Sequence, residues 1–365
     1  MPYKISGYKS ATARVIIFKE TDWSIESNTI VSGSGDYDIE ELESGNKLVI
    51  ARDNNGWTEG YGNVEAVYYP PSSGDRGVIS TGYNGGSLNT MSYVTISTTG
   101  NSTDFGDNSL ARFYASGLSN GITGRGITGG GTTNGSTRTG LIDYVTILSP
   151  SNGTSFGSLT TLKYNMASCS NGVNDRGVFM GGSVTSNQSR TEYITVSSPG
   201  NATTFGNLTV AKRWGAGCSN ATNERGIYGG GYISGDINVI EYITINSNGN
   251  GTDFGDLTDA YYSLAACDNG THDRAVFGGG LGTTNRKVMA YITISSTGNA
   301  VSFGSLLNDK YRHVATSNGT NDRGIYWGHD GNNIIEYITI TSTGNATDFG
   351  DLTADVYAAA NFSNG

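Results

Sequence analysis

Side chains that could carry chemistry are few in this chain of 365 residues, and most of them recur at a fixed spacing. The chain contains 3 histidines and 3 cysteines, the residues that most often hold a transition metal. Arginine is the other candidate, because it returns in an Asp-Arg-Gly type of turn every 49 to 51 residues. Its positions are Arg76, Arg125, Arg176, Arg225, Arg274 and Arg323. A ring of such arginines could bind an anion.

The histidines do not indicate a metal site. His272, His313 and His329 fall at three different positions of the repeated pattern, and His272 replaces an asparagine of the sister copies. The glycine clusters lack the strand-loop-helix context of a phosphate-binding loop. No Ser/His/Asp constellation is evident, although one assembled across distant copies stays open. We therefore expect a protein that is not an enzyme, with no catalytic residues, metal or cofactor.

The cysteines share one position of the pattern. Cys169, Cys218 and Cys267 are 49 residues apart, so they occupy equivalent places on successive units, too far apart for disulfide geometry. We interpret them as small buried hydrophobic side chains, which suits a chain made in a reducing cytoplasm.

The elements that position these residues are copies of one repeat. Each repeated arginine is followed by a tyrosine, at Tyr93, Tyr144, Tyr193, Tyr242, Tyr291 and Tyr337. A Phe-Gly pair comes next, beginning at Phe105, Phe156, Phe205, Phe254, Phe303 and Phe349. Four short strands in about 49 residues are typical of a propeller blade. A scaffold needs equivalence in every copy, so we predict that the arginine hydrogen-bonds a neighbouring blade and that the aromatic residues pack between blades.

The two ends of the repeat array complement each other. The first copy begins at Gly74 without the strand that precedes the other copies, and the segment from Leu352 to Gly365 carries that strand. Supplying it from the C-terminus closes a ring and leaves no sheet edge exposed. We predict an all-β fold: a six-bladed propeller over residues 71–365, closed by the C-terminal strand.

The repeat resembles the blades of kelch and galactose-oxidase-type propellers. The resemblance rests on the glycine pair after an apolar strand, the following tyrosine, and the aromatic residue before a segment containing Arg or Lys. Phe-Gly stands where kelch blades have tryptophan, and the glycine pair becomes Thr81-Gly82 and Gly328-His329 in the outermost copies. A galactose-oxidase-type copper site would need two histidines and a Tyr–Cys crosslink, for which the repeated cysteines are wrongly placed.

Residues 1–70 lack the repeat. Strands are predicted at 13–18, 28–32 and 47–51, with a turn at 33–37 between them. The phrases Ser-Gly-Ser-Gly-Asp-Tyr and Leu-x-x-Gly resemble those of carboxypeptidase regulatory-like (transthyretin-like) domains, which implies a small β-sandwich that acts as an adaptor. The stretch from Tyr69 to Gly74 is predicted to be a short, stiff linker.

Charge and hydropathy argue against two classes of partner. The net charge is −10 and no basic cluster is present, which disfavours nucleic acid. No apolar run approaches the roughly 20 residues of a membrane span, and the N-terminus lacks a signal-peptide pattern.

Function is expected where the copies differ, in the loops that follow the glycine pairs. Tyrosine, asparagine, serine and glycine on a rigid scaffold make an adaptable binding surface, and exposed aromatic residues beside amides suit saccharides. The residues predicted to bind a ligand are Tyr83, Asn84, Asn134, Arg138, Asn187, Arg190, Tyr232, Asp236, Asn285, Arg286, His329 and Asp330. For any one of them, a plain solvated turn is the alternative.

The near-identical repeats resemble those of bacteriophage tail-fibre and virion-surface proteins, on phrases such as Asp-Arg-Gly-Val-Phe and Glu-Tyr-Ile-Thr-Ile. This implies a non-enzymatic virion appendage, made in the host cytoplasm and displayed on the virion in several copies or as a homo-oligomer. The N-terminal domain would bind other virion proteins, and the propeller a host glycan or surface protein. The alternatives are a capsid- or tail-decorating protein without ligand, and a bacterial cell-surface adhesin or lectin.

Overall fold

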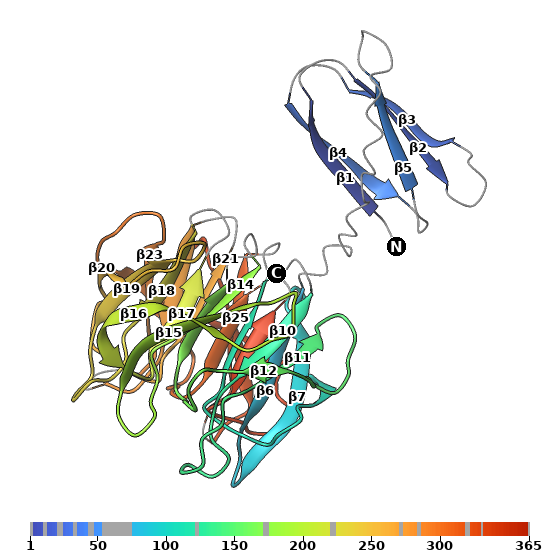
Figure 1. Ribbon diagram of the computed structural model, residues 1–365. Coiled ribbons are helices and arrows are strands. Elements are labelled where there is room, and N and C mark those ends of the chain that lie inside the picture. The colour runs from blue at the N-terminus through green and yellow to red at the C-terminus, as the bar shows by residue number, and fades with distance from the viewer. Residues whose placement is uncertain are drawn as a thin grey trace. The chain divides into compact units, whose positions relative to one another are not determined.

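Figure 1 shows the computed structural model of the chain, which divides into two compact units, Met1–Ser73 and Gly74–Gly365. In the first unit the structure describes the strands of two sheets. In the second it describes residues 75–120, 124–170, 175–219, 224–269, 273–282, 286–317, 322–329 and 331–363. None of the described residues forms a helix of the length and hydrophobicity that a membrane span requires.

The N-terminal unit contains two antiparallel sheets. One pairs β1 (Tyr3–Lys9) with β4 (Gly35–Leu42). In the other, β2 (Ala13–Lys19) lies between β3 (Ile25–Val31) and β5 (Lys47–Arg52). Strands were predicted at all three places of this second sheet. The turn predicted at 33–37 is partly wrong, because residues 35–37 already belong to β4; the transthyretin-like assignment stays a prediction.

The second unit is a propeller of six antiparallel, four-stranded blades, as predicted. The inner strands of blades 1 to 6 are β29 (Ala360–Ser363), β9 (Ser116–Ser119), β13 (Ala167–Ser170), β17 (Ala216–Ser219), β21 (Ala265–Asn269) and β25 (Val314–Ser317). The second strands are β6 (Arg76–Tyr83), β10 (Arg125–Gly129), β14 (Arg176–Met180), β18 (Arg225–Gly229), β22 (Arg274–Gly278) and β26 (Arg323–Trp327). The third strands are β7 (Ser87–Thr95), β11 (Leu141–Thr146), β15 (Gln188–Thr195), β19 (Val239–Thr244), β23 (Val288–Thr293) and β27 (Ile334–Thr339). The outer strands are β8 (Thr103–Asp107), β12 (Thr154–Ser158), β16 (Thr203–Lys212), β20 (Thr252–Asp256), β24 (Val301–Ser305) and β28 (Thr347–Asp351).

The C-terminal strand completes the first blade. β29 pairs antiparallel with β6, with Ala360 opposite Ser80 and Ser363 opposite Gly77. Phe362 on this strand is 3% exposed and packs against blade 2, where its ring fills the space that a Cβ on Gly126 would need. The predicted closure of the ring is therefore confirmed.

The hydrophobic core lies between blades. In one cluster, Phe105 of blade 1 packs with Val145 and Ile147 of blade 2 and with Phe362. The repeated tyrosine of each blade meets the repeated phenylalanine edge to face, with ring centroids 6.0 to 6.2 Å apart. The predicted packing between blades is confirmed for Phe105, whereas the ring contact of each tyrosine lies within its own blade.

The repeated arginines tie each blade to the next one. Arg76 donates a hydrogen bond to the carbonyl of Ile147, 2.8 Å away in blade 2, and Arg323 of blade 6 donates to the carbonyl of Ile96 in blade 1. The other four do the same at 2.8 to 3.2 Å. Each guanidinium also lies over the tyrosine of its own blade, 4.1 to 4.8 Å from the ring centroid. These contacts give the arginines the structural role that was predicted.

The Phe-Gly glycine permits a second link between blades. A Cβ on Gly106 would lie 2.6 Å from the carbonyl oxygen of Ser151 in the next blade. Beside this contact, the N–H of Asp107 donates to Oδ1 of Asn152 at 3.0 Å. The equivalent asparagine makes this contact in all six blades, each at 3.0 Å; it follows a glycine in five of them and Ser151 in blade 2.

Four blades contain a buried ion pair that the sequence analysis did not predict. The base precedes the inner strand and the acid stands on the third strand, in the pairs Arg112–Asp143, Lys163–Glu192, Lys212–Glu241 and Lys310–Glu336. Burial lowers the pKa of Lys163, and the neighbouring Glu192 offsets part of that effect. In the other two blades both partners are replaced together, by Tyr261 with Ala290 and by Val356 with Ser92. The two positions therefore vary as a unit.

This joint replacement predicts how blade 3 responds to mutation. Glu192→Ala leaves a lysine buried without its partner, which should lower the free energy of unfolding by about 3–5 kcal/mol. The double variant Lys163→Tyr/Glu192→Ala copies the solution of blade 5 and should recover most of that loss. Urea unfolding followed by tryptophan fluorescence measures both. A double variant as unstable as Glu192→Ala would show that the two positions are not coupled.

Ring closure predicts that substitutions at two equivalent positions of the repeat differ in their effect on the free energy of unfolding. Phe362→Ala empties a buried site at the junction of blades 1 and 2 and should cost about 3–5 kcal/mol in the free energy of unfolding. Thr316→Ala, at the same position of blade 6, removes far less apolar surface and should cost much less. Thermal unfolding of the two variants makes the comparison. If Phe362→Ala melts like the unmodified protein, then β29 does not close the ring.

Candidate functional site

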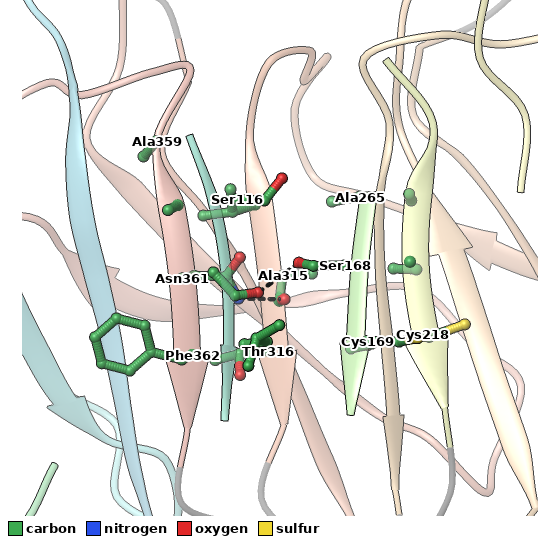
Figure 2. A pocket seen from close by; sticks show the side chains of 18 of the residues that line it. Ser116, Ser168, Cys169, Cys218, Ala265, Ala315, Thr316, Ala359, Asn361 and Phe362 are labelled. Atoms are coloured by element: carbon green, nitrogen blue, oxygen red, sulfur yellow. Dashed lines mark hydrogen bonds between the residues drawn. The ribbon is translucent and has the colours of Figure 1, made fainter. Parts of the chain in front are cut away.

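The inner strands surround an axial cavity of about 230 Å³. Figure 2 shows Phe362, Thr316, Cys169 and Cys218 at one level of this channel, with Ser116, Ala265 and Ala359 nearer the opposite end. Small side chains let six strands converge here. Serine hydroxyls link one strand to another, since Ser168 donates to the carbonyl of Gly117 at 2.7 Å and Ser116 to that of Met166 at 2.6 Å.

The cysteines point between blades and are free and buried, in accord with their predicted packing role. The sulfur of Cys169 fills the space of an absent Cβ on Gly226, and Cys267 does the same against Gly324. Burial raises the pKa of the Cys267 thiol to about 12. These thiols are therefore protonated and closely packed, which makes them poor nucleophiles.

Among the described residues that line the cavity, Asp268 is the one carboxylate, and it stands in a ring of serines at one end. Asp268 stands where the other five inner strands have Ser119, Ser170, Ser219, Ser317 and Ser363. Burial raises the pKa of Asp268 to about 7, and the N–H of Ser219, which donates to Oδ2 at 2.8 Å, offsets part of the effect.

A closed ring of backbone hydrogen bonds marks the other end of the channel. Just before its inner strand, each blade donates an N–H to the carbonyl of the preceding blade at 2.6 to 3.1 Å. The six residues, in blade order, are Ala358, Tyr114, Asn165, Trp214, Ser263 and Arg312. All have φ between 54° and 61°, a left-handed conformation that costs a residue with a Cβ about 1–2 kcal/mol. No two of them are alike, in contrast to the repeated positions.

Around this ring the side chains form a surface of aromatic rings and guanidinium groups, which we call the crown. Its aromatic members are Tyr83, Phe113, Tyr114, Tyr164, Trp214, Tyr232, Tyr262, Tyr311, His329 and Tyr357. Its cationic members are Arg138, Arg213, Arg286 and Arg312. Most of these side chains are partly exposed.

Contacts in the crown run from one blade to the next. Tyr232 of blade 4 lies 5.4 Å from Tyr262 of blade 5 between ring centroids, and Trp214 lies 5.3 Å from the same ring. In blades 1 and 2, Tyr83 meets Phe113 edge to face at 5.0 Å. The crown is therefore built by loops and pre-strand segments of several blades, with ring contacts that cross from one blade to the next.

The structure places five of the predicted ligand-binding residues in the crown: Tyr83, Arg138, Tyr232, Arg286 and His329. Of these, His329 is turned inward. It is 8% exposed, and its Nδ1 lies 3.1 Å from the carbonyl of Tyr311.

Two other residues that were predicted to bind a ligand stabilise loops instead. Asn134 accepts hydrogen bonds from the N–H groups of Ser136 and Thr137, which stabilises its own turn. Asn187 donates to the carbonyl of Ile233 in the next blade at 3.0 Å. Asn84 is exposed, Asp236 is partly exposed, and the exposed Arg190 lies 3.4 Å from Thr160 Oγ1. Asn285 and Asp330 lie outside the described residues.

The sequence analysis missed nine of the fourteen crown residues because it considered only the loops. The missed residues stand just before the inner strands: Phe113, Tyr114, Tyr164, Arg213, Trp214, Tyr262, Tyr311, Arg312 and Tyr357. A signal was present in the repeat alignment, since the ring position holds six different residue types.

The two histidines that the structure describes are both buried. His313 is 4% exposed, and burial lowers its pKa well below the usual value. His272 lies outside the described residues. Within the ranges that the structure describes, no group of three or more His, Cys, Asp or Glu side chains is placed to hold a metal ion.

Comparison of the sequence with protein-family models finds no match, and no curated protein is significantly similar to it. The site must be interpreted from its own geometry.

The burial of Asp268 predicts that replacing it stabilises the protein more at high pH than at low pH. Its carboxyl has a higher pKa in the folded chain than the usual value near 3.8, so folding favours the protonated form. Its contribution to stability is therefore lost as the pH rises from about 4 to about 7. Asp268→Ser, which copies the other blades, should raise the melting temperature at pH 8 more than at pH 4. An equal shift at both pH values would contradict the raised pKa.

Proposed function

We propose that this protein is a non-enzymatic binding module whose crown attaches to a glycan on a host surface. The observation that carries the proposal is the contrast between repeated and unrepeated positions. Repeated arginine, tyrosine, phenylalanine and asparagine side chains make contacts within and between blades, whereas the crown contains residues that differ from blade to blade. A scaffold does not require residues that differ from blade to blade, whereas recognition of a single asymmetric ligand does require them.

The chemistry of the crown suits a saccharide. Aromatic faces stack on the apolar faces of sugar rings, and guanidinium groups donate hydrogen bonds to sugar oxygens. Trp214, Tyr232 and Tyr262 form one aromatic cluster, and Tyr83, Phe113 and Tyr357 form another. Two clusters on one rigid ring can hold two sugar residues of one chain. A single contact of this kind is weak, and display in several copies multiplies it.

We place this activity on a bacteriophage particle. What supports the placement is the likeness of the repeat phrases to those of virion-surface proteins, together with the presence of a separate N-terminal unit that could bind other virion proteins. Mass spectrometry of purified particles tests it directly. Peptides of this chain at a fixed stoichiometry to a capsid or tail protein support the placement, and their absence contradicts it.

Binding itself is testable with the full-length protein on an array of bacterial capsular and O-antigen polysaccharides. We expect retention on a subset of them, weakened at least tenfold by Tyr232→Ala, which corresponds to about 1.4 kcal/mol of binding free energy. Val301→Ala is the control, because Val301 is 55% exposed and lies on the outer strand β24, away from the crown. Equal weakening by both variants, or no retention on any polysaccharide, would overturn the proposal.

A further inference from the structure

The arginines of the propeller fall into groups with different bonding. The six repeated arginines donate to main-chain carbonyls of the next blade. Arg112 is paired with Asp143 inside blade 2, and Arg190 contacts a threonine hydroxyl. The four crown arginines, Arg138, Arg213, Arg286 and Arg312, form no ion pair or side-chain hydrogen bond with any residue that the structure describes. Their positive charge is therefore available to something outside the chain.

Aromatic rings hold the crown arginines in place. The guanidinium carbon of Arg213 lies 4.1 Å from the ring centroid of Trp214 and 5.5 Å from that of Tyr232. A guanidinium that rests on the face of a ring keeps its N–H groups at the edge, where a planar anion can accept two of them. Stacking also reduces the conformational freedom that binding would otherwise remove. The Nε atoms of Arg138 and Arg213 are buried without a hydrogen-bond partner, which leaves donors of these side chains unsatisfied.

Arg312 has the most central position. It belongs to the closed backbone ring, with a φ of 55°, and lines the mouth of the axial cavity. Its guanidinium carbon lies 5.7 to 6.0 Å from the rings of Tyr114, Tyr311 and Tyr357, which come from three different blades. The next ring position is Ala358, so the smallest side chain of the ring lies beside the long arginine. None of the other five ring positions carries an arginine, so Arg312 gives the ring a positive charge on one side only.

We infer that the crown recognises an anionic saccharide, with Arg213 and Arg312 receiving its carboxylate or sulfate groups. The inference rests on the proposed function and specifies the class of glycan. The net charge of −10 opposes such binding, because it repels a polyanion at long range. Attraction must therefore come from a local positive site, and the crown supplies four stacked guanidinium groups. The axial cavity of about 230 Å³ is smaller than the ~300–1,000 Å³ typical of ligand pockets, so it admits one small group and not a chain.

The experiment compares matched charged and neutral polymers on the full-length protein. Polygalacturonate is paired with its carboxyl-reduced form, and dextran sulfate with dextran, so that the two pairs distinguish carboxylate from sulfate. Biolayer interferometry at two salt concentrations measures the affinity. We expect at least tenfold tighter binding to one charged polymer than to its neutral partner, with a loss of affinity as salt rises.

Arg213→Gln and Arg312→Gln remove the charge while they keep a side chain of similar length, and glutamine at 312 has the same backbone requirement as arginine. Each should weaken binding of the charged polymer at least tenfold and flatten its salt dependence. Arg52→Ala is the matched control, because it removes one positive charge from the N-terminal unit and should change neither property. Melting temperatures of all three variants show that they are folded.

The outcomes separate the two proposals. Equal affinity for charged and neutral polymers, or unchanged binding by both glutamine variants, overturns the anionic ligand and leaves glycan binding in place. Binding of neither charged nor neutral saccharides, here and on the polysaccharide array, overturns both.

Discussion

The propeller depends on a closed ring of six main-chain hydrogen bonds around its axis. Each bond joins one blade to the next, and the ring closes only when Ala358, just before β29, accepts from Tyr114 and donates to Arg312. A four-stranded blade cannot bury both of its faces alone, so its stability comes from its neighbours. The arginine links, the Gly-Asn turns and the hydrophobic clusters all form between blades and require the same closed geometry. Closure is thus the condition under which every blade has a neighbour on both sides.

The two kinds of arginine show how one residue type serves scaffold and surface. Where a main-chain carbonyl of the next blade lies at hydrogen-bond distance, as Ile147 does for Arg76, the guanidinium is satisfied inside the protein. In the crown the guanidinium groups stack on aromatic rings and meet no described carboxylate. Desolvated charges are stable only when paired, so charge that stays partly exposed without a partner is suited to an external ligand. The sequence motif alone distinguishes the first kind, because only the scaffold arginines recur at a constant spacing.

The blade strands, the closure by β29 and the packing role of the repeated aromatic residues could be predicted because each depends on periodicity, which six copies make unambiguous. The site was less predictable. Asn134 and Asn187 were expected to face a ligand, yet local turn geometry and the neighbouring loop use their amides. His329 was expected on the surface and instead packs on Tyr311. Arg312 and Trp214 were missed because their importance comes from a left-handed ring that only the assembled blades create. The ion pair Lys163–Glu192 was missed because its partners belong to different strands of the blade, although their joint replacement at Tyr261 and Ala290 is visible in the repeat.

The ion-pair positions and the ring positions both vary between blades, but the physical causes of their variation differ. The ion-pair positions change together because a buried charge without its partner is strongly destabilising, so the side chains themselves are constrained. The ring positions change independently because their hydrogen bonds use only main-chain atoms, which every residue except proline supplies. Tyr114, Trp214 and Arg312 can therefore differ without weakening the closure that their backbones provide. At Tyr114, Trp214 and Arg312, which are partly exposed at the mouth of the channel, the scaffold therefore requires tolerance of a positive φ but no particular side-chain hydrogen bond. An asymmetric binding surface can form on a nearly symmetric fold because the symmetric part of the contact belongs to the backbone.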